Sequence, residues 1–248
     1  MGLVIYADFG SLACYLASRR ADALTAAGIP VDWRAVEADP WLPVSWRRID
    51  VAGHAVLERE LESLESLLLP DEELPLSLPA FRPNTRGAVS GFAEAYGAGV
   101  SDDVRRLLFD AYWTRGADIG SPGTLRRLLA GPLLRGHSPS VPVTEFGYAV
   151  SPSRGPITTD AFRLIREWSR QREILGAGRL PVLVVDEWSP VSGETALRLL
   201  EKELLRAGAP VGPALAAPGR YPVPGDRPDL FWVSETGGRW RHTWKAGA

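Results

Sequence analysis

The fold of this chain is decided by the stretch Asp8-Phe9-Gly10-Ser11-Leu12-Ala13-Cys14-Tyr15-Leu16-Ala17-Ser18. The stretch follows a short apolar strand pattern over residues 2–7 and opens a helical pattern that runs to about Ala27. Ser11 and Cys14 lie three residues apart, so they share one face of that helix. Free N–H groups and the positive end of the dipole at a helix N-terminus favour a thiolate or another anion. A Cys-x-x-Cys redox pair would occupy this place, and here its first sulfur is replaced by an oxygen.

Length and composition indicate an ordinary globular chain. It has 248 residues, 45% hydrophobic and 23% charged, and a formal net charge of −2. This charge gives no electrostatic reason to expect nucleic acid or an anionic membrane as a partner. A single cysteine excludes an intrachain disulfide. With no signal-peptide pattern and no apolar run of about 18 residues, we expect a cytoplasmic protein.

The basic residues are unevenly chosen. Lysine occurs only at Lys202 and Lys245, and all other basic side chains apart from histidine are arginines. We attribute this excess to codon usage rather than to recognition chemistry.

The first 37 residues predict one βαβ unit. After the helix that begins near Ser11, Gly28 is suited to the position past the helix end and Pro30 stops the helix. Val31–Val36 then largely alternates apolar and polar residues and predicts a second strand. Two strands joined in this way are expected to be parallel, with a right-handed crossover.

Residues 50–131 predict an all-helical block without strands. The expected helices run from His54 to Leu69, from Pro83-Asn84-Thr85 to about Gly97, from an N-capping Ser101 to about Gly116, and from Ser121-Pro122 to Ala130.

The remaining third begins with residues 132–157, which are rich in proline, serine and glycine and suggest an extended piece. A helix over Thr159–Leu175, a strand over Leu180–Val185 entered through Pro181, and a helix over Gly193–Arg206 follow. Residues 207–228 read as a connector. The last segment predicts a β-hairpin formed by Leu230–Val233 and Arg239–Trp244.

This order of elements resembles the DsbA-like superfamily of thioredoxin-fold proteins, which includes FrnE-type DsbA oxidoreductases, 2-hydroxychromene-2-carboxylate isomerases and kappa-class glutathione transferases. The resemblance is carried by residues 6–16, 31–36, 83–85 with 111–121, and 180–185. It implies an α/β, thioredoxin-like fold with a large helical insertion and an added C-terminal hairpin. The implied parts are a thioredoxin-like domain (1–37 and 155–207), a helical insert (50–131), an extended connector (132–154) and a C-terminal extension (208–248).

The resemblance also implies a site. Ser11 aligns with the attacking cysteine, and in the isomerase branch a serine here contacts the sulfur of glutathione. The backbone of Leu180, before a cis Pro181, would pair with the peptide part of a low-molecular-weight thiol, glutathione or mycothiol. The residues themselves leave simpler interpretations open: Ser11 as a helix N-cap, and Pro181 as a trans proline at a strand entry.

Cys14 aligns with the second, resolving cysteine. With no first cysteine, dithiol exchange within the chain is impossible. An exposed Cys14 would still form a mixed disulfide with a small thiol, whereas a lone cysteine one turn into a helix is more often a small buried hydrophobe.

Other candidates are less specific. Trp41 and Trp46 lie in the connector that would border the cleft over Ser11, where they would line a substrate pocket or pack the subdomains together. Asn84 resembles a family motif but is also a favoured N-cap. The three histidines, His54, His137 and His242, have no metal-ligand spacing, so no metal site is expected.

Three functions follow as hypotheses. The first is a thiol-cofactor-dependent isomerase or transferase acting on a small conjugated substrate, with Ser11 holding the thiolate. The second is a degenerate, non-catalytic binding protein, favoured by the lost cysteine and by Val89, which stands where related proteins often carry a histidine. The third is a monothiol oxidoreductase using Cys14. A small molecule is the expected partner, and homodimerisation is left open.

Overall fold

The structure is a computed structural model. It describes residues 2–43, 46–70, 72, 74, 78–176, 178–186 and 189–209, and the backbone of two further strands at 232–235 and 239–242.

A four-stranded mixed sheet forms the centre of the molecule, in the order β2-β1-β5-β6. Its strands are β1 (Leu3–Ala7), β2 (Val31–Ala35), β5 (Val182–Val185) and β6 (Val191–Ser192). β1 and β2 are parallel, with Ile5 opposite Trp33, which confirms the predicted βαβ unit. β5 is antiparallel to β1, and β6 is antiparallel to β5. The first and last thirds of the sequence thus build one sheet.

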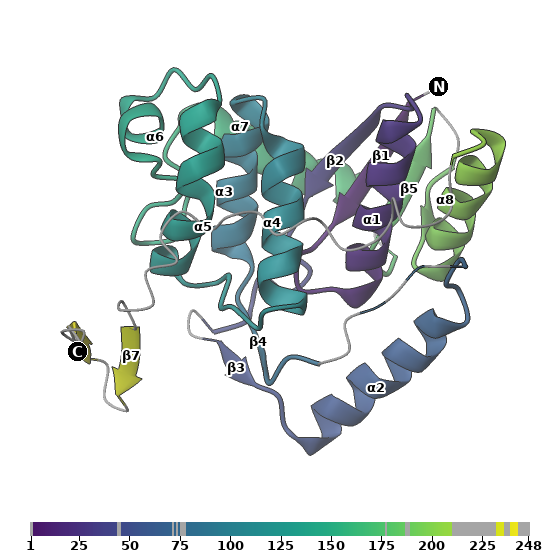
Figure 1. The fold of residues 1–248 in the computed structure, drawn as a ribbon, viewed down its shortest axis with the longest axis horizontal. Helices are drawn as coiled ribbons and strands as arrows, with labels where there is room; N and C mark the ends of the chain where they lie inside the picture. Colours follow the sequence, from purple (N-terminus) through teal and green to yellow (C-terminus); the bar gives the residue numbers. More distant parts are fainter. Residues whose placement is uncertain are drawn as a thin grey trace, which may run out of the picture.

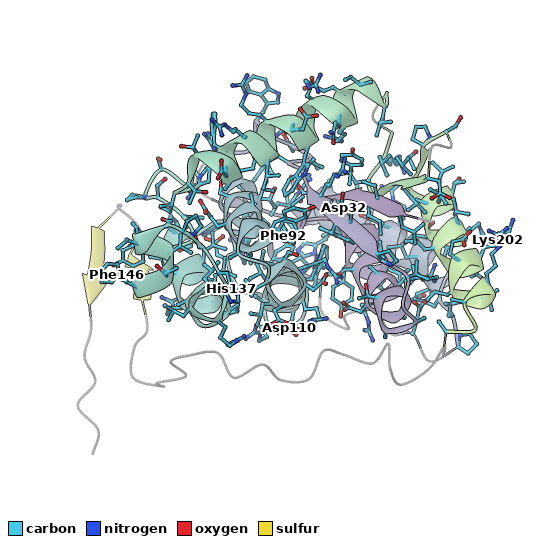
Figure 2. The ribbon with its side chains drawn as sticks, turned by 90° about the horizontal axis from the view of Figure 1, so that it is seen from above. Asp32, Phe92, Asp110, His137, Phe146 and Lys202 are labelled. Atoms are coloured by element: carbon cyan, nitrogen blue, oxygen red, sulfur yellow. The ribbon has the colours of Figure 1, made fainter. Side chains whose placement is uncertain are left out.

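Helices cover both faces of this sheet (Figures 1 and 2). α1 (Leu12–Ala26) and α8 (Glu194–Arg206) lie on one face, and α7 (Thr159–Ile174) lies across the other. α1 is the most deeply buried element, with Leu12, Leu16 and Leu24 fully inaccessible. Gly28 follows it with a φ of +82°, a conformation that glycine adopts without strain.

A second group of helices stands beside the sheet (Figure 1). It comprises α3 (Arg86–Gly97), α4 (Ser101–Trp113), α5 (Pro122–Arg135) and the short α6 (Val141–Phe146). Phe92 of α3 points into the packed interior (Figure 2) and lies 5.8 Å from Phe9, ring centre to ring centre. Phe9 also packs on Phe109 of α4 at 5.0 Å. These aromatic contacts join the helices to the loop that precedes α1.

α2 (Val51–Glu65) is set apart from the other helices (Figure 1). All fifteen of its residues are described, and Leu64 alone among them is buried. The helix begins three residues before the predicted start because the Asp50 carboxylate caps it, accepting from the Gly53 N–H at 2.8 Å. It ends at Glu65 rather than Leu69.

Several sequence predictions are corrected here. The block over 50–131 is not free of strands, because β4 (Phe81–Arg82) lies in it and pairs with β3 (Arg47–Arg48). Two-residue strands are too short to produce a period-two pattern. Ser101 is the first helical residue of α4 and not its N-cap, which is Val100.

The segment 132–154 is not an extended connector. α5 continues past Ala130 to Arg135 with Pro132 inside it, where the proline removes one backbone hydrogen bond near the helix end. α6 then forms over residues for which an extended piece was expected. Pro142 stands in its first turn and Gly147, with a φ of +63°, ends it.

The predicted terminal hairpin is present as β7 (Trp232–Glu235) paired antiparallel with β8 (Arg239–His242). The rest of the predicted C-terminal extension from residue 210 onward lies outside the described residues. Among the helices that are described, none combines the length and apolar character of a membrane span. The same part of the chain contains no cluster of three histidine, cysteine or acidic side chains suited to a metal.

Candidate functional site

A large cavity of about 960 Å³ lies at the N-terminal end of α1. Its inner side is formed by the start of α1 and by the segment that leads into β5. Its outer side is formed by α2, β3 and β4 (Figure 1). The cavity thus lies where the two halves of the sheet meet the separate helix α2.

Ser11 lines this cavity and is half-buried. It is the N-cap of α1: its backbone is extended, and its Oγ accepts a hydrogen bond from the Cys14 N–H at 3.4 Å. The capping interpretation is therefore confirmed. The hydroxyl hydrogen is not used by this bond, so Ser11 retains a donor for a group in the cavity.

Leu180 lines the same cavity. The Leu180–Pro181 peptide bond is cis, as the sequence comparison implied. The carbonyl of Pro181 accepts a hydrogen bond from the Gly193 N–H at 2.9 Å, which fixes the entry to β5 against the start of α8. The structure thus brings Ser11 and Leu180, 169 positions apart in the sequence, to one cavity.

Cys14 is fully buried and does not line the cavity. Burial raises the pKa of its thiol from the ordinary value of 9.0 to about 12, although a hydrogen bond with Ser11 opposes the rise. Only the thiolate is nucleophilic, and monothiol exchange needs an exposed, acidified sulfur. The structure contradicts both conditions, so the Cys14 oxidoreductase hypothesis is wrong for this conformation, and the small buried hydrophobe is the correct interpretation.

Asp8 is a buried acid beside Ser11 that the sequence interpretation did not single out. Its carboxylate accepts hydrogen bonds from the N–H groups of Gly10 and Ala38, each at 2.6 Å, and from the Thr85 hydroxyl at 2.8 Å. Burial raises its pKa, and these bonds together with the charge of Arg82 oppose the rise. Asp8 ties the loop before α1 to the loops that follow β2 and precede α3.

Glu60 of α2 lines the same cavity, on its outer side. The Ala13 N–H in the first turn of α1 lies near its carboxylate and favours the charged form. Burial raises the pKa of Glu60, whereas the positive charges of Arg82 and Arg179 and the Ala13 N–H lower it. One of the free N–H groups of the α1 N-terminus, that of Cys14, is therefore satisfied by Ser11, and Glu60 supplies a negative charge beside another.

Arginine is the most frequent side chain around the cavity. Six arginines line it, from β3, α2, β4, α7 and the segment before β5: Arg47, Arg48, Arg59, Arg82, Arg172 and Arg179. Four of their guanidinium groups, those of residues 47, 48, 82 and 179, make no hydrogen bond or ion pair with any other described residue. Five carboxylates line the cavity as well, among them Asp50, which caps α2, and Glu194, which accepts from the Ser63 hydroxyl at 2.7 Å. The four unpaired guanidinium groups are available to an anion.

Six of the arginines whose abundance we attributed to codon usage thus line one cavity. Arg47-Arg48 is an adjacent basic pair, and it was the signal available in the sequence. Arg82 lies far from Arg172 and Arg179 in the sequence, and only the fold brings the three side chains to one cavity.

The tryptophans predicted to line the substrate pocket lie outside the lining of this cavity. Trp41 is 91% exposed, and Trp46 is half exposed and packs on Phe81 at 5.7 Å between ring centres. The apolar part of the lining comes instead from Leu42 and from Val56 and Leu57 of α2.

Asn84 has a structural role, as its residue type favoured, but it is not the N-cap of α3. Its Nδ2 donates to the Leu42 carbonyl at 2.9 Å and its Oδ1 accepts from the Arg86 N–H at 3.1 Å. Thr85, not Asn84, is the N-cap position of α3, and it makes no capping bond through its side chain.

Comparison with solved structures identifies the fold. A probable DsbA oxidoreductase from Streptomyces coelicolor is 17% identical, with a TM-score of 0.59 over 84% of this chain and 90% of its own. A 2-hydroxychromene-2-carboxylate isomerase is also 17% identical, with a TM-score of 0.54 over 83% of this chain and 95% of its own. The cytosolic disulfide reductase DsbM from Pseudomonas aeruginosa, solved with GSH, is 15% identical, with a TM-score of 0.53 over 83% of this chain and 100% of its own.

No family model matches the sequence, and no curated protein matches it. The likeness is therefore one of structure at low identity, and it extends over most of both chains. Together with the sheet order and the helices inserted between its halves, it establishes that this chain has the DsbA-like thioredoxin fold.

Proposed function

We propose that this protein is a thiol-cofactor-dependent enzyme, an isomerase or transferase that acts on a small conjugated substrate. The observation that carries the proposal is that Ser11 and Leu180 line one cavity while the chain's single thiol, Cys14, is buried outside its lining. The cavity therefore offers a hydroxyl, and no thiol of the protein, to the sulfur of a bound thiol cofactor. The fold is shared with an isomerase and with a reductase that was solved with GSH.

In the proposed reaction the nucleophile is the cofactor's thiolate. The Ser11 hydroxyl donates a hydrogen bond to the sulfur, and the Leu180 backbone pairs with the cofactor's peptide part. When bound, the cofactor would supply a thiolate for reversible addition to the conjugated double bond, the C–S bond forming as the π electrons move onto the conjugated acceptor and breaking again after rotation. A transferase would instead expel a leaving group and retain the C–S bond.

The arginines of the cavity support an anionic cofactor. Glutathione carries two carboxylates, and unpaired guanidinium groups bind carboxylates with two parallel hydrogen bonds. Mycothiol lacks that charge, so the same side chains favour glutathione between the two thiols considered.

The test is calorimetry with glutathione and mycothiol on the wild type, on Ser11→Ala and on Ser121→Ala. Ser121 is a matched control, because it caps α5 with the same geometry as Ser11, accepting from the Thr124 N–H at 3.4 Å, and lies outside the cavity lining. Either substitution removes a cap worth about 1 kcal/mol. Only Ser11→Ala should weaken thiol binding. Absence of binding of either thiol at millimolar concentration contradicts the proposal.

A non-catalytic binding protein is the second candidate. It is favoured by one observation: the Cys14 N–H is occupied by Ser11, and the carboxylate of Glu60 stands near the Ala13 N–H. A binder would take the thiol without accelerating its addition to a test electrophile such as 1-chloro-2,4-dinitrobenzene, whereas the proposed enzyme accelerates it.

A further inference from the structure

The carboxylate of Glu60 occupies a position that suits an anion from solution. It lies near the Ala13 N–H, at the positive end of α1, and the charges of Arg82 and Arg179 act on it. Glu60 itself lines the cavity together with Ser11, Leu180 and both arginines. An anion is thus already present between a helix N-terminus and two guanidinium groups.

Glu60 comes from a helix that is mostly exposed. α2 buries Leu64 alone, and Val56, one turn before Glu60, is 53% exposed. The carboxylate is half-buried and lacks a hydrogen-bonded arginine or a salt bridge within 4 Å among the described residues. This differs from Glu72, whose carboxylate is held by Arg20 at 2.7 Å with both side chains fully buried. Glu60 is therefore free of the contacts that lock a structural ion pair in place.

We infer that Glu60 is an internal anion that competes with an anionic ligand for the start of α1, so that the ligand binds only as this carboxylate is displaced or neutralised. The inference rests on the function proposed above and concerns the control of that same site. A thiolate or other anion beside Ser11 and the Glu60 carboxylate repel each other, and both use the same N–H groups and guanidinium charges.

Protonation of Glu60 removes its charge and so relieves the competition. The direction of the pH effect on binding follows from the groups around Glu60. Burial raises its pKa, so lowering the pH neutralises Glu60 before an ordinary glutamate. The groups around it are Arg82 on β4, Arg179 before β5, and the Ala13 N–H and Cys14 on α1, and Asp8 also lines the cavity. Asp8 also has a raised pKa, and the experiment has to separate the two acids.

Two glutathione derivatives make the test specific for charge. Glutathione sulfonate carries a permanent negative charge at the sulfur position, and S-methylglutathione is neutral there. Calorimetry at pH 7.5 compares the wild type with Glu60→Gln, which keeps the side-chain shape, and with Glu60→Ala. Glu58→Gln is the control, because Glu58 is exposed on the same helix and does not line the cavity.

We expect both Glu60 variants to bind the sulfonate about tenfold more tightly than the wild type, and S-methylglutathione equally well within about twofold. Glu58→Gln should match the wild type with both compounds. As the pH is lowered toward the pKa of Glu60, sulfonate binding by the wild type should approach that of Glu60→Gln, whose affinity should stay constant.

Equal sulfonate affinity of wild type and Glu60 variants overturns the inference, and so does an equal gain for both compounds, which would mean that the charge of Glu60 acts on the rest of the ligand and not at the sulfur position. A pH dependence that persists in Glu60→Gln assigns it to Asp8 and also overturns the inference. These outcomes leave the proposed function intact. If neither compound binds any variant, the proposed function fails and this inference fails with it.

Discussion

The two sides of the cavity differ in packing and in charge. The inner side consists of the start of α1 and the segment before β5, where Leu12 is fully buried and Ala13 is 7% exposed. The outer side consists of α2, β3 and β4, where Arg47, Arg48 and Arg82 are exposed and α2 buries a single residue. The inner side therefore fixes the positions of the Ser11 hydroxyl and the Leu180 backbone. The outer side supplies Arg47, Arg48 and Arg82, and the inner side adds Arg179 to the positive charge that faces a ligand.

The largest expected effect is on the reactivity of the Cys14 thiol, which is buried behind the inner side of the cavity. With the pKa of Cys14 at about 12 against an ordinary 9.0, the native protein at pH 8 contains about 1,000-fold less thiolate than the unfolded chain. Its reaction with a thiol reagent, followed by absorbance, should be slower than in denaturant by at least this factor, and burial slows it further. The native rate should rise about tenfold for each pH unit up to about 12 while the fold is intact. Rapid reaction at pH 8 would mean that α1 opens readily.

The next effect tests the buried contacts that hold α1, and with it the inner side of the cavity, in place. Arg20 of α1 is fully buried and hydrogen-bonds the Glu72 carboxylate at 2.7 Å, the Leu197 carbonyl of α8 at 2.7 Å and the Leu67 carbonyl at 2.5 Å. Removing one partner leaves a buried charge unpaired, so Arg20→Ala should lower the free energy of unfolding by about 3–5 kcal/mol. Urea denaturation measures it.

The control for Arg20→Ala is Arg163→Ala, which breaks an exposed pair with Asp160 and should change the free energy of unfolding by less than about 1 kcal/mol. Similar values for the two variants would show that the buried pair does not hold α1.

The outer side should affect binding and not stability. Arg47 and Arg48 have no partner among the described residues, so the double variant Arg47→Ala/Arg48→Ala removes two charges without breaking a contact. We expect glutathione affinity to fall about tenfold at low ionic strength, and the deficit to shrink at 0.5 M salt, where the Debye length is under about 8 Å. Calorimetry at the two salt concentrations measures this. A deficit independent of salt would indicate a lost shape contact instead of a lost charge.

The same division between the two sides marks what the sequence predicts and what it does not. The strand β1, the capped start of α1 and the parallel partner β2 were predictable because each has a local signal: an apolar run, an N-cap serine and alternation. The resemblance to a known family then supplied the pairing of this half with Pro181. The inner side of the site was therefore available from the sequence, including Ser11 and Leu180.

The outer side was not predictable, because its residues have no shared local pattern. Glu60 reads as one charged position among several on an exposed helix. Arg82 and Arg179 are brought together by tertiary contacts across about 100 residues. The interpretation of Cys14 as a possible exchange thiol failed for a similar reason, since burial depends on packing by α8 and α4 and not on its neighbours in sequence.

The smallest expected effect tests whether Leu57 or Trp41 forms the apolar lining of the ligand site. Trp41 is 91% exposed and does not line the cavity, whereas Leu57 of α2 does. Trp41→Ala should therefore leave the affinity for S-methylglutathione unchanged within about twofold. Leu57→Ala should weaken it about three- to tenfold, because a half-buried leucine gives up part of the 1.5–3 kcal/mol that a fully buried one contributes. The opposite ranking would mean that α2 moves aside on binding and that the connector at Trp41 closes over the ligand, which would make the outer side a different surface when the site is filled.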